Sequence, residues 1–220
     1  MINFHPTDDQ IHRFAQGNLP AAEALIVSAH CDMCSECNAK LLSESEKQAS
    51  EALGEFSSDP ALDSMMAEII QQPVPQIDSV ALPLQSTIEL DGRTFAVPRA
   101  LRRYVRKTGN WSSLVGKLWQ APVDLGSVGM AHFIYMEKGG RVPEHTHKGT
   151  EHTLVINGEF SDGISEYDSG DFISLNDGHT HAPLSDASEG CLVFSIVDKP
   201  LHFTSGLARL LNPFSHLFFK

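Results

Sequence analysis

The 220-residue sequence lacks any apolar run of the roughly 18 residues needed to cross a lipid bilayer. Its first ten residues, MINFHPTDDQ, hold neither a basic nor an apolar segment, so we expect no secretory signal and a cytoplasmic location. There is no internal repeat and no low-complexity tract. Hydrophobic residues make up 41% of the chain, which is sufficient for the core of one domain or of two small ones.

Basic residues are scarce in the first 90 positions, where 3 Lys and Arg stand against 14 Asp and Glu. Residues 91–220 hold 13 against 14, so the net charge of −12 belongs almost entirely to the N-terminal part. Contacts with DNA phosphates need clustered Lys and Arg, and we therefore expect no direct nucleic-acid binding. An acidic surface suits a basic partner, including a protein whose own function is to bind DNA.

Cysteine is scarce as well, and three of the four cysteines lie within residues 31–37. In a reducing compartment such a group favours metal binding over disulfides. The spacing His30-x3-Cys34-x2-Cys37 supplies three ligands for tetrahedral zinc. A redox function of the Cys-x2-Cys pair is disfavoured because no βαβ pattern surrounds it. The candidate for the fourth ligand is His5, with His12 and Cys31 as alternatives.

The N-terminal part predicts four helices. Thr7 and Gln10 fit a capping box at the start of the first helix, and Gly17-Asn18 is a stop signal. The next two helices are expected from Pro20 to about His30 and from about residue 35 to residue 56. The fourth begins at Asp59-Pro60 and carries apolar residues at helical spacing, namely Leu62, Met65, Met66, Ile69 and Ile70. We expect a helical domain over residues 1–75 and a proline-rich linker over residues 76–84.

After the linker, short apolar runs alternate with turns that contain Gly, Asn and Asp. Many short strands at near-regular spacing predict an all-β domain, an antiparallel sandwich or barrel, over residues 85–200. Residues 201–220 are apolar and unlike the rest, and they could form a small terminal helix or a dimer contact.

A second group of metal-ligating residues lies in this C-terminal part. His145 and His147 are two residues apart and would share one face of a strand, and a short turn would return Glu151 to the same site. The hairpin turn at Asn176-Asp177-Gly178 would bring in His181 from a neighbouring strand. This mixed set suits Zn, Fe, Mn, Ni or Cu. His179 is the alternative to His181, while His132 and His152 are interpreted as supporting or surface groups.

Cys191 lies in the apolar run CLVFSIV, where alternation points it inward. A small core residue is the favoured interpretation, and an oxidisable thiol near the metal is the alternative.

These patterns resemble known families. Gly139-x5-His145-x-His147-x3-Glu151-x6-Gly158 resembles the first cupin motif, and Gly170-x5-Asn176-x-Gly178-x2-His181 resembles the second, with Asn176 where the family usually has Pro. The cupin fold implied is a small β-barrel with its metal inside. His5 with His30-x3-Cys34-x2-Cys37 in an acidic helical domain resembles the zinc-binding anti-sigma domain, and the combination is similar to the ChrR family of anti-sigma factors.

That resemblance implies zinc on His5, His30, Cys34 and Cys37, and zinc or another divalent transition metal on His145, His147, Glu151 and His181. It implies a non-enzymatic regulator that sequesters an extracytoplasmic-function sigma factor and releases it on oxidative stress, by singlet oxygen or organic peroxide. The apolar face of the fourth helix is the candidate sigma contact. A homo-oligomer formed through the cupin domain is left open. The alternative function is a cupin metalloenzyme, similar to a dioxygenase, that carries a helical zinc-binding domain.

Overall fold

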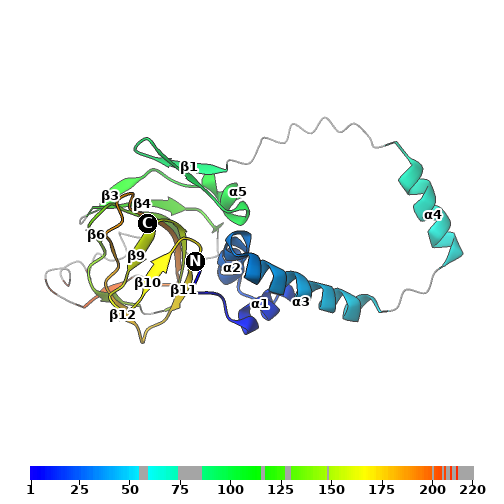
Figure 1. The fold of residues 1–220 in the computed structure, drawn as a ribbon, viewed down its shortest axis with the longest axis horizontal. Coiled ribbons are helices and arrows are strands. Elements are labelled where there is room, and N and C mark those ends of the chain that lie inside the picture. The colour runs from blue at the N-terminus through cyan, green and yellow to red at the C-terminus, as the bar shows by residue number, and fades with distance from the viewer. Residues whose placement is uncertain are drawn as a thin grey trace.

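The computed structural model describes residues 1–54, 59–73, 86–114, 117–126, 130–147, 149–199, 201–204, 206, 209 and 212. The expected linker and most of the expected tail lie outside these residues. Helices come first and antiparallel strands follow (Figure 1), which confirms the predicted order of a helical part and a β-barrel.

Three helices form the N-terminal group: α1 (Asp8–Ala15), α2 (Ala21–Met33) and α3 (Ser35–Leu53). The predicted capping box is present, since Gln10 N–H donates to the Thr7 hydroxyl and the Gln10 side chain accepts from Thr7 N–H. Helix α2 continues to Met33, beyond the expected end at His30. Cys34 caps α3 with its sulfur atom, so the turn between α2 and α3 is built around a predicted zinc ligand.

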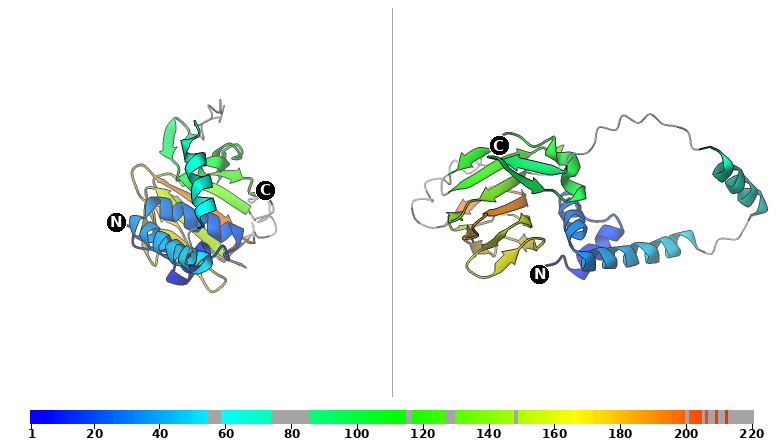
Figure 2. Two further views of the ribbon diagram at one scale, coloured as in Figure 1. Left: turned by 90° about the vertical axis from the view of Figure 1, so that its right-hand side faces the viewer. Right: turned by 45° about the horizontal axis from the view of Figure 1, so that its top comes forward.

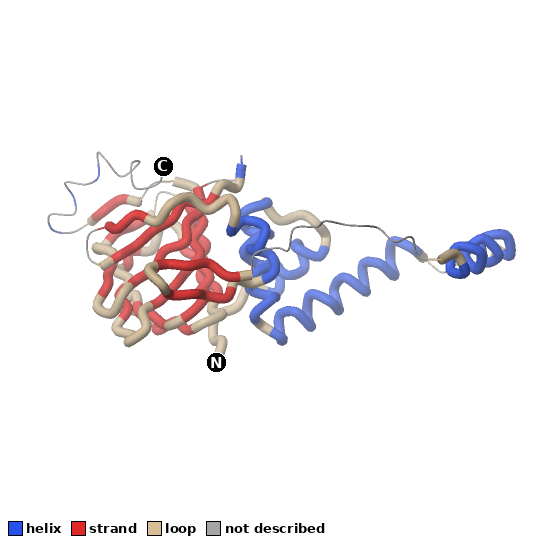
Figure 3. Tube along the Cα trace, turned by 90° about the horizontal axis from the view of Figure 1, so that it is seen from above, coloured by secondary structure: helices blue, strands red, loops and turns tan. Residues whose placement is uncertain are grey.

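Helix α4 (Pro60–Gln71) starts where Asp59-Pro60 predicts, and the Asp59 carboxylate accepts the Ala61 N–H. None of its residues is buried against the described part of the chain. It stands apart from the other helices and from the barrel (Figures 1 and 3). Its apolar stripe is therefore exposed, with Met66 at 57% and Ile69 at 58% relative exposure.

The largest sheet has six antiparallel strands in the order β11-β8-β14-β5-β4-β3. Their bounds are β3 Ser112–Leu114, β4 Leu118–Val123, β5 Met130–Met136, β8 Glu151–Asn157, β11 Phe172–Leu175 and β14 Cys191–Val197. Strand β14 coincides with the apolar run CLVFSIV singled out in the sequence. Of the second candidate site, Glu151 lies in this sheet, at the start of β8.

Short strands complete the barrel, and two of them, β7 and β12, carry His145 and His181, which the sequence places on strands. A four-stranded sheet has the order β10-β9-β13-β6, and a three-stranded sheet has the order β12-β7-β15. Their bounds are β6 Gly140–Arg141, β7 His145–Thr146, β9 Glu159–Ser161, β10 Glu166–Asp168, β12 Thr180–His181, β13 Leu184–Ser185 and β15 His202–Phe203. Strand β15 pairs with β7, so the start of the expected tail is part of this sheet.

A hairpin of β1 (Thr87–Leu90) and β2 (Arg93–Ala96), the 3-10 turn η1 (Arg99–Leu101) and the short helix α5 (Arg102–Val105) precede the barrel strands. Together with α2 they cover the outer face of the six-stranded sheet (Figures 1 and 2).

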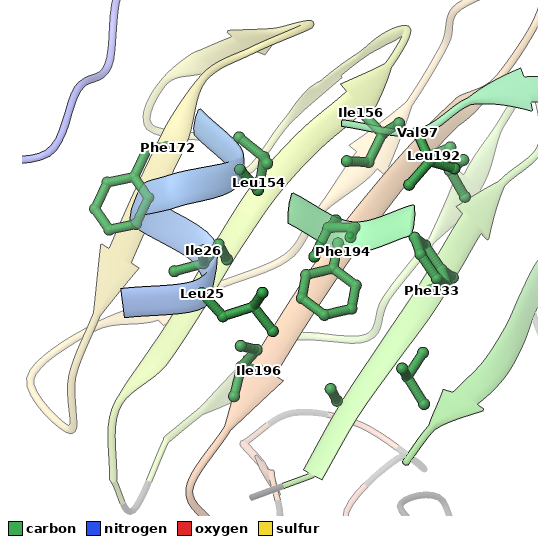
Figure 4. Close-up of a cluster of buried hydrophobic side chains, with 14 of the residues drawn as sticks. Leu25, Ile26, Val97, Phe133, Leu154, Ile156, Phe172, Leu192, Phe194 and Ile196 are labelled. Carbon is green, nitrogen blue, oxygen red and sulfur yellow. The ribbon is translucent and has the colours of Figure 1, made fainter. Parts of the chain in front are cut away.

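Both faces of this sheet are buried. Leu25 and Ile26 of α2 lie over Leu154, Phe194 and Ile196 of the sheet, in one continuous apolar core (Figure 4). The alternate residues of the same strands face the barrel interior. The helical part and the barrel therefore share a core, and a single layer of β-sheet separates α2 from the interior of the barrel.

Candidate metal centres and the contact between them

The first site gathers the four predicted residues His5, His30, Cys34 and Cys37. One ligand atom from each lies within 4.8 Å of the others. His5 Nδ1 is 3.4 Å from Cys37 Sγ and 3.6 Å from Cys34 Sγ. Two imidazoles and two thiols at this separation fit the tetrahedral N/S set that zinc prefers.

His30 is oriented for such a role. Its Nδ1–H donates to the carbonyl oxygen of Gly170 at 2.7 Å, and its buried Nε2 has no hydrogen-bond partner among the described residues. A metal-binding histidine commonly donates its other ring N–H to a carbonyl, which fixes the tautomer. Burial, opposed by the bond to Gly170, lowers the His30 pKa to about 4, so the ring is neutral. A neutral, buried, unpartnered nitrogen is the state that a metal requires.

The cysteines of the site need a cation to ionise. Burial, followed by the nearby Cys34 thiol, raises the Cys37 pKa to about 12. Without a cation this thiol stays protonated at neutral pH, whereas a coordinated divalent metal deprotonates it. The donor set therefore fits zinc.

Both alternative ligands lie outside this group. His12 Nδ1 bonds the Glu44 carboxylate at 2.9 Å and its Nε2 faces Gln16, on the surface of α1. Cys31 lies on α2, where it is buried in the apolar core, and it is not among the four clustered residues.

The barrel holds the N-terminal segment that carries His5. Asp171 is fully buried, and its Oδ1 accepts the backbone N–H groups of Asn3 at 2.6 Å and Phe4 at 3.0 Å. Phe172 N–H donates to the Phe4 carbonyl at 2.9 Å, so this segment runs beside β11. Sequence reasoning missed Asp171, because the pairing joins residues about 168 positions apart and no local pattern marks it.

Gly170 is required at this junction. Its φ of +96° lies in the region that favours glycine, and a Cβ there would lie 2.5 Å from Ile2 Cδ1. The glycine of the second motif thus lets the first residues of the chain and His30 approach the barrel.

The second site gathers His145, His147, Glu151 and His181, again within 4.8 Å. His145 and His181 are cross-strand partners on β7 and β12, and Glu151 begins β8. His181 Nε2 lies 2.9 Å from His145 Nε2 and 3.0 Å from His147 Nε2. The turn at residues 176–178 brings His181 into the site, as its spacing predicts.

The orientation of these side chains fits a divalent metal. His145 Nδ1–H donates to the Pro143 carbonyl at 2.8 Å, which leaves the Nε2 lone pair facing the other two rings. Glu151 Oε1 accepts from Thr153 at 2.9 Å and from Ser195 at 2.8 Å, while its buried Oε2 faces the imidazoles, 3.0 Å from His147 Nε2. Lone pairs that converge in this way repel one another unless a cation lies between them.

Electrostatics agree with this interpretation. Burial, followed by the neighbouring His181, lowers the His145 pKa to about 4. Burial alone would raise the Glu151 pKa, but the adjacent His147 and the other imidazoles hold it well below its usual range. The site therefore presents three imidazoles and one carboxylate, and this mixed N/O set does not select one metal.

The remaining histidines and Cys191 take other places. His179 is exposed and bonds Asn176, outside the cluster. His132 is buried at 2% exposure rather than lying at the surface. Cys191 is fully buried in an apolar cluster with Met136 and Val155, and burial raises its pKa, in keeping with a small core residue.

One aromatic side chain lies between the two sites. The Phe172 ring is edge-on to His30, with centroids 6.2 Å apart, and it stacks on His152 at 5.9 Å. His152 follows Glu151 directly in β8. A chain of ring contacts thus runs from His30 through Phe172 to His152, which is the sequence neighbour of Glu151 in the second site.

The chain is thus of the class that packs a helical unit with a Cys2His2 cluster on a β-barrel with a His3Glu cluster, and each cluster could hold a metal ion. The model of the ChrR cupin-like domain matches residues 106–199. The chain is 30% identical, over 97% of its length and 98% of the relative, to anti-sigma-E factor ChrR of Cereibacter sphaeroides. This chain belongs to the ChrR family of anti-sigma factors.

A solved structure agrees with that assignment. The crystal structure of Rhodobacter sphaeroides SigE in complex with the anti-sigma ChrR has a TM-score of 0.66 and 25% identity to this chain. The match covers 90% of this chain and 100% of that one. The family is one of regulators, in agreement with the expectation that the chain is not an enzyme. Among the described residues, no helix is both long enough and apolar enough to span a membrane.

Proposed function

We propose that this protein is a zinc-dependent anti-sigma factor that sequesters an extracytoplasmic-function sigma factor. The relationship to ChrR carries the proposal, because the relative is named for this activity and was solved with its sigma factor. We assign residues 1–75 to the sigma-binding unit, residues 76–84 to a linker, residues 85–200 to the barrel and residues 201–220 to a tail. The protein acts in the cytoplasm and makes no direct contact with nucleic acid.

Zinc holds the helical unit together through His5, His30, Cys34 and Cys37. A helical unit of this size is near the limit at which a hydrophobic core alone gives stability, so a bound metal adds to it directly. In the barrel, His145, His147, Glu151 and His181 hold zinc or another divalent transition metal. A metal bound there would hold these four side chains together in a centre that an oxidant could disrupt.

Helix α4 is the proposed sigma contact. Its residues Met65, Met66, Ile69 and Ile70 form an exposed apolar stripe that no described residue covers. An amphipathic helix with such a stripe is suited to lie in an apolar groove of a partner.

Release follows from a change in the barrel. Oxidative stress, by singlet oxygen or organic peroxide, alters the His3Glu centre, and the barrel then shifts against α2 and the N-terminal segment. Support comes from the contacts that join residues 170–172 of the barrel to the helical part and to β8: Gly170 to His30, Asp171 to Asn3 and Phe4, and Phe172 to His30 and His152. A change transmitted along them reaches the zinc ligands.

The test is co-purification with the extracytoplasmic-function sigma factor encoded beside this protein. We expect a one-to-one complex that is lost when a chelator strips the zinc and that re-forms when zinc is returned. A zinc-loaded, folded protein that fails to bind this sigma factor would refute the proposal. Exposure of the complex to singlet oxygen or an organic hydroperoxide then tests release, with His145→Ala/His147→Ala as the unresponsive control.

A further inference from the structure

The interior of the barrel holds a partly open cavity of about 110 Å³ beside the second centre. His145, Glu151 and His181 form one side of it. Most of the remaining wall is aliphatic or aromatic. Its side chains come from the six-stranded and the four-stranded sheet and include Leu118, Ile134, Met136, Phe160, Ile173 and Val193. A cavity lined in this way gains little from holding water and favours an apolar occupant.

Several polar groups of the wall are already engaged. Thr153 and Ser195 donate to Glu151, and the Tyr167 hydroxyl donates to Asp162 at 3.0 Å. An occupant therefore finds its polar partner at the metal-binding side, and the rest of the occupant meets apolar surface.

The charge at the metal-binding side determines which polar group the occupant presents there. A metal-bound imidazole carries no charge, so three imidazoles and one carboxylate around a divalent ion leave a net charge of about +1 in a buried place. The positive charge favours an anionic oxygen donor over a neutral one. The buried Asp162 carboxylate of the same wall is already engaged, since it accepts from the N–H groups of Ile164 and Ser165 and from the Tyr167 hydroxyl. Size limits the tail, because the cavity is smaller than the ~150 Å³ apolar cavity known to hold benzene. A tail of about four or five carbons fits.

We infer that the barrel binds a short-chain aliphatic carboxylate, with its carboxylate at the metal and its tail among the apolar side chains. This inference rests on the barrel holding a divalent metal, which is part of the proposed function. It adds to the proposed function a chemical class of ligand that the barrel binds.

The experiment is calorimetry on the full-length, metal-loaded protein with sodium acetate, butyrate, pentanoate and octanoate, and with 1-pentanol. Burial of each methylene strengthens binding about fourfold, so affinity rises from acetate to pentanoate and falls at octanoate. The alcohol binds at least about tenfold more weakly than pentanoate, because it lacks the charge. With Co²⁺ in the barrel, pentanoate shifts the visible absorption and the alcohol does not.

Two variants test the cavity itself. Val193→Leu narrows the cavity and shifts the preferred acid to a shorter chain, and Ile134→Val widens it and shifts the preference to a longer one. Ile196→Val is the matched control, since Ile196 lies on the outer face of the sheet with α2, and it leaves the preference unchanged. Thermal melting and metal content confirm that each variant is folded and loaded.

Absence of saturable binding by any acid, equal affinity for acetate and pentanoate, or an unchanged preference in both cavity variants overturns the inference. Sigma binding is measured separately in the same preparations. Loss of sigma binding with intact carboxylate binding counts against the proposed function alone, and the reverse counts against the ligand alone.

Discussion

The Nδ1 atom of His30 lies 2.7 Å from the carbonyl oxygen of Gly170, so a proposed zinc ligand of the helical unit is held by a turn of the barrel. The same turn precedes Asp171, which binds the segment leading to His5, and Phe172, which packs against the His30 ring. Gly170, Asp171 and Phe172 follow one another in the chain. Each of them contacts either His30 or the segment that carries His5. The barrel is a structural support for the zinc site, besides having a site of its own.

Cys34→Ser removes one thiolate from the first site and is expected to lower the zinc content by one equivalent per chain. Structural zinc contributes directly to folding free energy, so the melting temperature falls as well. Cys31→Ser is the matched control, because Cys31 is a buried cysteine three residues away and outside the cluster. Metal analysis and thermal melting check this, and equal zinc loss in both variants would contradict the assignment.

Asp171→Asn is expected to loosen the N-terminal segment. The Asp171 carboxylate accepts N–H groups from Asn3, Phe4 and Asp168, and an amide cannot accept at both of its ends. The expected loss of stability is about 1.5–3 kcal/mol, together with faster zinc release to a chelator. Denaturant unfolding and stopped-flow chelation measure these changes. The exposed Asp177→Asn has the same change of charge and should leave both quantities unaltered.

Met66→Asp/Ile69→Asp is expected to abolish sigma binding without loss of stability. Both side chains are more than half exposed, so the charges cost little in the free protein but must be desolvated in an apolar interface. Ser64→Asp/Gln71→Asp places the same charge on the opposite face of α4 and should retain binding. Pull-down and melting curves decide the matter, and binding by the first variant would exclude α4 as the contact.

The sequence predicts both ligand sets because each is nearly local. Cys34 and Cys37 share the first turn of α3, and His145 and His147 lie two residues apart, so spacing alone indicates convergence. His5 and His181 needed a further inference about a turn or a helix start. The contact between the two units could not be predicted, since it depends on pairings such as Asp171 with Asn3 that join the two ends of the fold and have no periodic signal. For the same reason, the composition suggests two independent halves, whereas the structure joins them. Helix α2 and the barrel share one apolar core.

Phe172→Leu tests whether the two centres communicate. Phe172 is buried between His30 and His152, and leucine retains an apolar side chain while removing the ring that contacts both. We expect a modest loss of stability of about 1–2 kcal/mol, with both metals still bound.

In the unchanged protein, loss of the barrel metal through His145→Ala/His147→Ala should speed zinc release from the first site severalfold. In the Phe172→Leu background this acceleration should shrink, which is a coupling measured by a double-mutant cycle. Leu154→Val is the control for loss of packing alone. Leu154 is a core residue of β8 that faces α2, and valine is smaller than leucine. An equal acceleration in all three backgrounds would show that the two sites act independently of Phe172.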